Sequence, residues 1–217
     1  MSDAATARVN MVEGQIRTNK VTDHRIVKAM AAVPREIFVP KSLAGVAYID
    51  EDIPIAPGRY LVEPLVFARL LQEAAIGPDD VVLDIGCGTG YSAAVLARLA
   101  AAVVALENDQ DLADSATEKL ADLGADNTAV VSGNLPEGYP DQGSYDVVVI
   151  NGSVEHIPEA IVSQVSDGGR IVAVVNKGGI GRATLFQVQK GNVAGIPIFE
   201  TSVPSLPGFG QARGFVF

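Results

Sequence analysis

The sequence predicts one α/β domain with a mainly parallel central sheet, and three observations lead to this fold class. Short apolar runs typical of buried strands alternate with helix-like segments between residues 81 and 175. Such alternation implies right-handed crossovers between parallel strands. The length of 217 residues, with 48% hydrophobic and 19% charged residues, suits a single domain with a large core.

We divide this domain into three parts. Residues 1–64 form a helical N-terminal appendage and a loop, residues 65–190 form the ligand-binding core with helices flanking the sheet, and residues 191–217 form a C-terminal extension with a final strand. In the appendage, apolar residues recur at helical spacing over 8–34, and Asp23 is placed to cap the second helix. Residues 41–64 have no clear periodicity and several prolines, so we expect a long loop there.

The apolar pattern also predicts the elements of the core. We expect helices at residues 65–75, 92–99 and 109–123, and another from Pro158 through Val165. We expect strands at residues 81–85, 103–107, 128–131, 145–150, 168–175, 183–189 and 214–217. The stretch from Ile196 to Gly210 is rich in proline and glycine, and we assign no element to it.

A glycine-rich loop follows the strand at residues 81–85. Its sequence, Asp84-Ile85-Gly86-Cys87-Gly88-Thr89-Gly90, places an acid two positions ahead of glycines at every second position. Glycine permits a tight turn and a close approach of a ligand to the backbone. The spacing differs from the G-x-G-x-x-G of dinucleotide sites and from the phosphate-binding P-loop, which disfavours a nicotinamide enzyme.

A second acid, Glu107, ends the next expected strand and lies 21 positions after Gly86, where nucleotide-binding α/β folds place a ribose-binding carboxylate. Together these features resemble the first motif of the class I S-adenosylmethionine-dependent methyltransferases. The resemblance implies a Rossmann-like fold, S-adenosyl-L-methionine as the methyl donor and S-adenosyl-L-homocysteine as the product. It assigns donor binding to Asp84, Gly86, Cys87, Gly88, Gly90 and Glu107, and an adenine contact to Asn134, where the family usually has aspartate.

The N-terminal region indicates which family of class I methyltransferases the chain resembles. In order and spacing it is similar to protein-L-isoaspartate O-methyltransferases, through Met11-Val12, Gln15-Ile16, Val33-Pro34-Arg35-Glu36 and Phe38-Val39-Pro40. The similarity runs from about residue 11 to residue 175. It implies an enzyme that methylates a carboxylate of isoaspartyl residues in damaged proteins, so that its partner is a protein or peptide.

The expected loop departs from that family. The family has a G-Q-T-I-S-x-P-like motif whose hydroxyl residues face the substrate and the donor. Gly58 and Pro64 match its ends, but Arg59, Tyr60 and Val62 stand where the family has glutamine, threonine and serine. If the isoaspartyl substrate is retained, Arg59 would pair with a substrate carboxylate and Tyr60 would supply a hydroxyl.

The acceptor side carries few other catalytic candidates. Glu155 and His156 follow a strand's carboxyl end and are a weaker candidate wall of the acceptor pocket, although a lone histidine there is more often solvated. A carboxylate acceptor is already ionised at neutral pH, so the reaction requires no general base. Two separated histidines and a single cysteine give no recognisable metal site.

Net charge and hydropathy indicate which kinds of partner the protein does not bind. The net charge of −10 argues against nucleic-acid binding, and no apolar run approaches the roughly 20 residues that span a bilayer. We therefore expect a cytoplasmic enzyme, a monomer or weak homo-oligomer. Two alternatives stay open: a methyltransferase with a different acceptor on the same scaffold, and a non-catalytic S-adenosylmethionine-binding protein.

Overall fold

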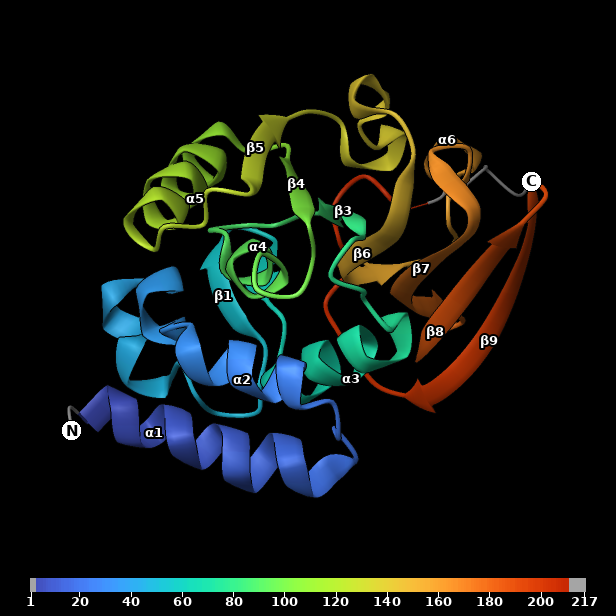
Figure 1. Ribbon diagram of the computed structural model, residues 1–217. Coiled ribbons are helices and arrows are strands. Elements are labelled where there is room, and N and C mark those ends of the chain that lie inside the picture. Colours follow the sequence, from blue (N-terminus) through green and yellow to red (C-terminus); the bar gives the residue numbers. More distant parts are fainter. Residues whose placement is uncertain (1–2, 211–217) are drawn as a thin grey trace, which may run out of the picture.

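The computed structural model describes residues 3–210, and its centre is a seven-stranded sheet in the order β5-β4-β3-β6-β7-β8-β9 (Figure 1). The first five strands in this order are parallel, whereas β8 and β9 are antiparallel. The strands are β3 (Val81–Ile85), β4 (Ala102–Glu107), β5 (Thr128–Ser132), β6 (Tyr145–Val154), β7 (Val165–Lys177), β8 (Ile180–Gln189) and β9 (Asn192–Glu200). This sheet confirms the predicted mainly parallel α/β fold.

Helices precede and connect these strands. They are α1 (Asp3–Met11), α2 (His24–Ala32), α3 (Pro64–Ala74), α4 (Tyr91–Leu96), α5 (Gln110–Asp122) and α6 (Glu159–Val162). A π-helical turn (Val12–Ile16) continues α1, and short 3-10 helices lie at Arg17–Asn19, Arg35–Phe38, Lys41–Val46, Leu135–Glu137 and Pro140–Gln142. The helical N-terminal appendage is confirmed, and no helix within residues 3–210 is long and apolar enough to cross a membrane.

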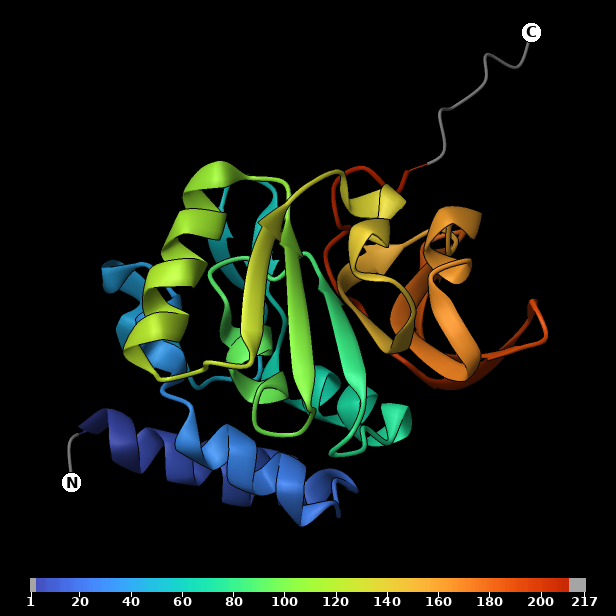
Figure 2. The same ribbon diagram turned by 45° about the horizontal axis from the view of Figure 1, so that its top comes forward.

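The alternation of side chains along the strands divides the core into two layers. On one face, Val82 and its neighbours pack with α2, α3, α4 and α5; on the other, Leu83 packs with the one-turn helix α6 and the C-terminal segment around Leu206. The two views agree that α1 and α2 lie on one side of the molecule and β8 and β9 on the other (Figures 1 and 2). Helices therefore cover the two faces unequally.

The expected long loop at residues 41–64 is wrong in part. After the 3-10 helix, β1 (Ile53–Ala56) and β2 (Arg59–Leu61) form an antiparallel hairpin that is a sheet of its own. Its turn contains Gly58 at φ 69°, a left-handed conformation that suits glycine. In β2 the buried positions are Arg59 and Leu61. Because one of the inward residues is charged, the sequence shows no alternation of apolar and polar residues that would predict this strand.

Two other expectations are corrected near the C-terminus. The helix after Pro158 ends at Val162 instead of Val165, because Val165 already begins β7. Residues 192–200 form β9, so the sheet extends past residue 190, where we ended the core, and into the stretch from Ile196 to which we assigned no element. As the outer strand, β9 tolerates Pro197, which cannot donate a ladder hydrogen bond. The expected strand at residues 214–217 lies outside the described residues.

Candidate functional site

The glycine-rich loop is held against the neighbouring strand. Gly86, Gly88 and Gly90 have φ values of 72°, 57° and 98°. The amides of Gly86 and Cys87 both donate to the Leu106 carbonyl of β4, at 2.8 and 3.3 Å. The loop is thus a tight turn of the kind that the spacing predicts. Burial raises the pKa of the Cys87 thiol well above its usual value, which makes this cysteine a packing residue and no nucleophile.

Asp84 lies at the carboxyl end of β3 and is fully buried. Its carboxyl group accepts hydrogen bonds from the Ser92 hydroxyl at 2.6 Å and from the Asn151 amide at 2.7 Å. Burial raises the pKa of Asp84 to about 7, while these two donors oppose the rise. Asn151 was not predicted as a site residue; the signal that could have indicated it is its position directly after the apolar run 145–150 of β6, the strand beside β3.

Glu107 is the second predicted acid, and its carboxylate is completely enclosed. The Arg59 guanidinium binds both oxygens: Nη2 donates to Oε2 at 2.7 Å, and Nη1 donates to Oε1. Three backbone amides also donate to this carboxylate, from Gly88 at 2.8 Å, Asn108 at 2.9 Å and Asp109 at 3.1 Å. An ionised carboxylate has about four lone-pair sites, so Glu107 has no free direction for a ligand hydroxyl.

Two apolar side chains cover the glycines. A methyl group added at Gly88 would lie 2.5 Å from Ile55 Cδ1, and one at Gly86 would lie 2.8 Å from Leu206 Cδ1. The cavity left between the hairpin and Gly86 and Cys87 measures about 10 Å³, whereas ligand pockets occupy roughly 300 Å³ or more. The loop and Glu107 have the chemistry of a donor site, but in this conformation the site has no room for S-adenosylmethionine.

The three substrate-loop candidates point in different directions. Arg59 is 5% exposed and bound to Glu107, and its pairing with a substrate carboxylate stays a prediction. Tyr60 is 38% exposed on the outer side of the hairpin. Val62 is buried, and its carbonyl accepts from Arg35 Nη2 at 2.7 Å. Of these three residues Arg59 contacts Glu107, whereas Tyr60 and Val62 line the small cavity beside Gly86 and Cys87.

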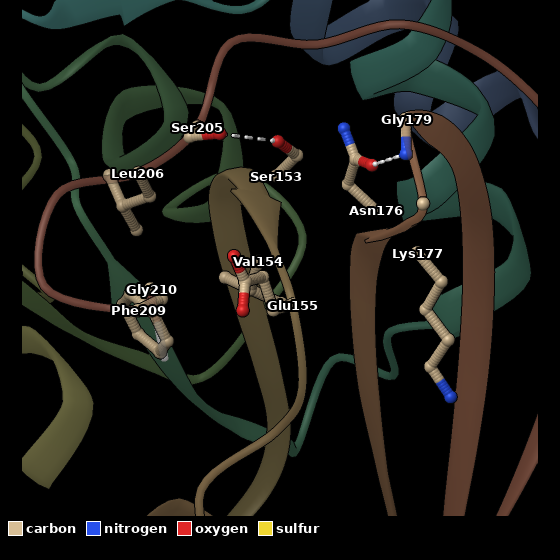
Figure 3. Close-up of a pocket in the computed structure, with 11 residues that line it drawn as sticks. Ser153, Val154, Glu155, Asn176, Lys177, Gly179, Ser205, Leu206, Phe209 and Gly210 are labelled. Atoms are coloured by element: carbon tan, nitrogen blue, oxygen red, sulfur yellow. Dashed lines mark hydrogen bonds between the residues drawn. The ribbon is translucent and has the colours of Figure 1, made fainter. Parts of the chain in front are cut away.

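An open cavity of about 590 Å³ lies next to this closed site (Figure 3). It is formed by the end of β6, the turn between β7 and β8, and the C-terminal segment. The Ser153 hydroxyl donates to the Ser205 hydroxyl at 3.4 Å within it. Leu206 lines this cavity and also lies against Gly86, so it stands between the cavity and the glycine-rich loop.

The remaining candidates lie at the edges of this region. Glu155 lines the cavity, while His156 beside it is exposed and does not. Asn134 is exposed just beyond β5, and its amide donates to Glu137 Oε1 at 2.8 Å. Among residues 3–210, no group of three or more histidine, cysteine, aspartate or glutamate side chains is placed to hold a metal ion.

Comparison with known proteins identifies the family. Residues 7–201 match the family model of protein-L-isoaspartate(D-aspartate) O-methyltransferase. A protein-L-isoaspartate O-methyltransferase of Methanoculleus marisnigri is 43% identical over 168 residues, which cover 77% of this chain and 76% of the relative. A protein-L-isoaspartate O-methyltransferase of Koribacter versatilis is 40% identical over 171 residues, which cover 79% of this chain and 77% of the relative.

Solved structures agree on the fold. A protein-L-isoaspartate O-methyltransferase superposes with a TM-score of 0.81 at 27% identity and covers 94% of this chain and 67% of its own. A Plasmodium falciparum structure is described as a β-aspartate methyltransferase in complex with S-adenosyl-L-homocysteine. It has a TM-score of 0.78 at 19% identity, and the superposition covers 92% of this chain and 97% of the Plasmodium chain. The family model and the two relatives confirm the resemblance indicated by the motifs, and the chain belongs to the protein-L-isoaspartate(D-aspartate) O-methyltransferase family.

Proposed function

We propose that this protein transfers a methyl group from S-adenosyl-L-methionine to a carboxylate of isoaspartyl residues in damaged proteins. The observation that supports this most strongly is family membership across residues 7–201, a range that contains the glycine-rich loop and Glu107. The proposed donor-binding residues are Asp84, Gly86, Cys87, Gly88, Gly90, Glu107 and Asn134. The cytoplasmic location and the monomeric or weakly oligomeric state stay predictions.

The chemistry of the acceptor fits the residues around the site. A carboxyl group with a pKa of about 4 is ionised at neutral pH and is itself the nucleophile. No side chain has to remove a proton, so the catalytic contribution reduces to orientation and exclusion of water, which is worth up to roughly 7–11 kcal/mol. This agrees with a site in which Asp84 and Glu107 are both engaged in hydrogen bonds.

A second candidate is a methyltransferase with another acceptor. Val62 supports it, because a buried apolar side chain stands where the resembled motif has a serine. Valine cannot make the hydrogen bond of a serine hydroxyl, and an unpaired polar group on the substrate costs about 1–3 kcal/mol. Such a loss would weaken recognition of the isoaspartyl group.

The test incubates the protein with isotopically labelled S-adenosylmethionine and an isoaspartyl peptide. The control is the peptide of the same sequence with a normal aspartyl residue. We expect label in the isoaspartyl peptide alone. Label in neither peptide, together with label in proteins of a cell extract, would favour the second candidate. Absence of transfer to any acceptor would contradict both.

Two variants sharpen this assay. Val62→Ser restores a hydroxyl at that position, and a large gain in isoaspartyl activity would mean that the wild-type chain recognises this substrate poorly. Tyr60→Phe removes the hydroxyl that stands in the family's threonine position and keeps the ring. A loss of activity in Tyr60→Phe would assign Tyr60 to substrate binding, and unchanged activity would remove it from the site.

A further inference from the structure

The closed donor site is covered from two sides. Ile55 and Arg59 come from the β1–β2 hairpin, residues 53–61, which we call the lid hairpin. Leu206 comes from the C-terminal segment. The backbone amide of Leu206 donates to the Ser153 carbonyl at 2.8 Å. Of these contacts only that of Arg59 is ionic. It is a buried bidentate pair, the strongest class of side-chain hydrogen bond.

The lid hairpin is held to the rest of the molecule at its base and near its tip. It forms a two-stranded sheet with no strand pairing to the central sheet. At its base, the Glu63 amide donates to Asp52 Oδ1 and the Leu65 amide to Asp50 Oδ1, both at 3.0 Å. Near its tip, Arg59 joins Glu107 on β4 and also donates to Asn108 Oδ1 at 3.1 Å. Releasing Arg59 therefore removes the ionic contact near the tip, while the hydrogen bonds at the base and the packing of Ile53 and Leu61 in the core remain.

Arg59 and a donor would compete for the same atoms. In nucleotide-binding α/β folds, a carboxylate in the position of Glu107 accepts a hydrogen bond from a ribose hydroxyl. The Arg59 guanidinium already occupies both oxygens of Glu107. If Arg59 leaves, Glu107 keeps its three backbone donors, so the carboxylate remains partly satisfied and available to hydroxyl groups.

We infer that the lid hairpin closes the donor site of the free protein and that Arg59 must leave Glu107 before S-adenosylmethionine binds. This inference rests on the proposed function. Arg59 then acts as an internal competitor that sets donor affinity, and it is no substrate ligand in the closed state. The apparent dissociation constant equals the intrinsic one divided by the open fraction, so a 1% open population weakens binding about 100-fold.

The test measures S-adenosyl-L-homocysteine binding by calorimetry in the wild type, Arg59→Gln and Arg182→Gln. Glutamine removes the charge at residue 59 and cannot hold both Glu107 oxygens. Arg182 is the matched control because it makes an exposed ion pair with Glu200, at 3.3 Å, between β8 and β9. We expect Arg59→Gln to bind at least tenfold more tightly than the wild type, and Arg182→Gln to bind as the wild type does.

The outcomes separate the inference from the proposed function. Equal or weaker binding by Arg59→Gln, with clear binding by the wild type, overturns the inference and leaves the methyltransferase proposal intact. Binding by Arg59→Gln alone supports the inference in its strongest form. Binding by none of the three at millimolar ligand overturns both, because release of Arg59 would then have opened no donor site.

A second measurement keeps the test decisive if Arg59→Gln does not fold. The chain has no tryptophan, and Tyr60 is exposed on the lid hairpin, so Tyr60→Trp introduces a single fluorescent reporter there. When ligand binding has to wait for opening, the observed rate levels off as S-adenosyl-L-homocysteine increases. We expect such a plateau in stopped-flow traces, and a rate that rises linearly throughout would overturn the inference.

Discussion

Glu63 lies at the base of the lid hairpin, close to two other acids. Burial raises its pKa to about 7, and the neighbouring Asp52 and Asp50 add to the rise, while a hydrogen bond from the Thr201 hydroxyl opposes it. A proton on Glu63 therefore relieves both desolvation and repulsion in the folded state. The group is poised to titrate at physiological pH, at the point where the hairpin joins the core.

This titration predicts a pH-dependent stability. Because the pKa of Glu63 is higher in the folded state than in the unfolded chain, its contribution is fully present below about pH 4.5 and is lost as the pH rises through 7. Glu63→Gln should raise the free energy of unfolding by about 1–2 kcal/mol at pH 8 and by much less at pH 5. Urea unfolding at both pH values measures this.

The control for that experiment is Glu118→Gln, which makes the same change of charge on the exposed face of α5. An equal gain in the two variants, or a gain in Glu63→Gln that does not depend on pH, would show that the acids around Glu63 do not destabilise the folded state.

Single residues of the proposed donor site were predictable where the signal was local. The glycines and Glu107 follow from spacing along two neighbouring strands, because parallel strands bring their carboxyl ends together. The pairing of Arg59 was not predictable, since its partner lies 48 residues away and a buried charge contradicts the usual polar-outside pattern. Leu206 gave no signal, because nothing local indicates that it touches Gly86.

At the scale of elements, α2 illustrates a helix whose start is encoded locally. The Asp23 side chain accepts a hydrogen bond from the Arg25 amide at 2.8 Å, as expected for an N-cap. Asp23→Ala should lower the free energy of unfolding by about 1 kcal/mol. Asp23→Asn keeps the capping oxygen and should cost clearly less in the same thermal or urea unfolding series. Equal losses in the two variants would indicate that charge, and not capping, is what Asp23 contributes.

The elements that sequence reasoning missed are short or irregular. The lid hairpin has strands of four and three residues, and one of its inward positions is an arginine, so no apolar period-two pattern is visible. The helix after Pro158 is shorter than predicted because it ends at Val162 and β7 begins at Val165. Longer elements with caps or continuous apolar runs, such as α5 and β6, were located correctly to within a few residues.

For the whole molecule, the unequal covering of the sheet and the closure of the site are connected. The helices α2, α3, α4 and α5 complete the core on one face, whereas the other relies on short segments and on the stretch that contains Leu206 and Phe209. This stretch fills the core and also covers Gly86. If the proposed donor site opens fully, a part of the molecule that contributes to its stability has to move.

The net charge of −10 predicts how the whole molecule selects among substrates. An acidic protein repels acidic peptides and attracts basic ones over distances of about a Debye length, roughly 8 Å at physiological salt. For isoaspartyl peptides of equal length, we expect kcat/KM to be roughly threefold or more higher with lysine flanks than with glutamate flanks at low salt. The ratio should fall towards one as sodium chloride rises to about 0.5 M, where charges are screened within a few ångströms. A ratio that does not change with salt would place the preference in direct contacts with the peptide instead of in the field of the protein.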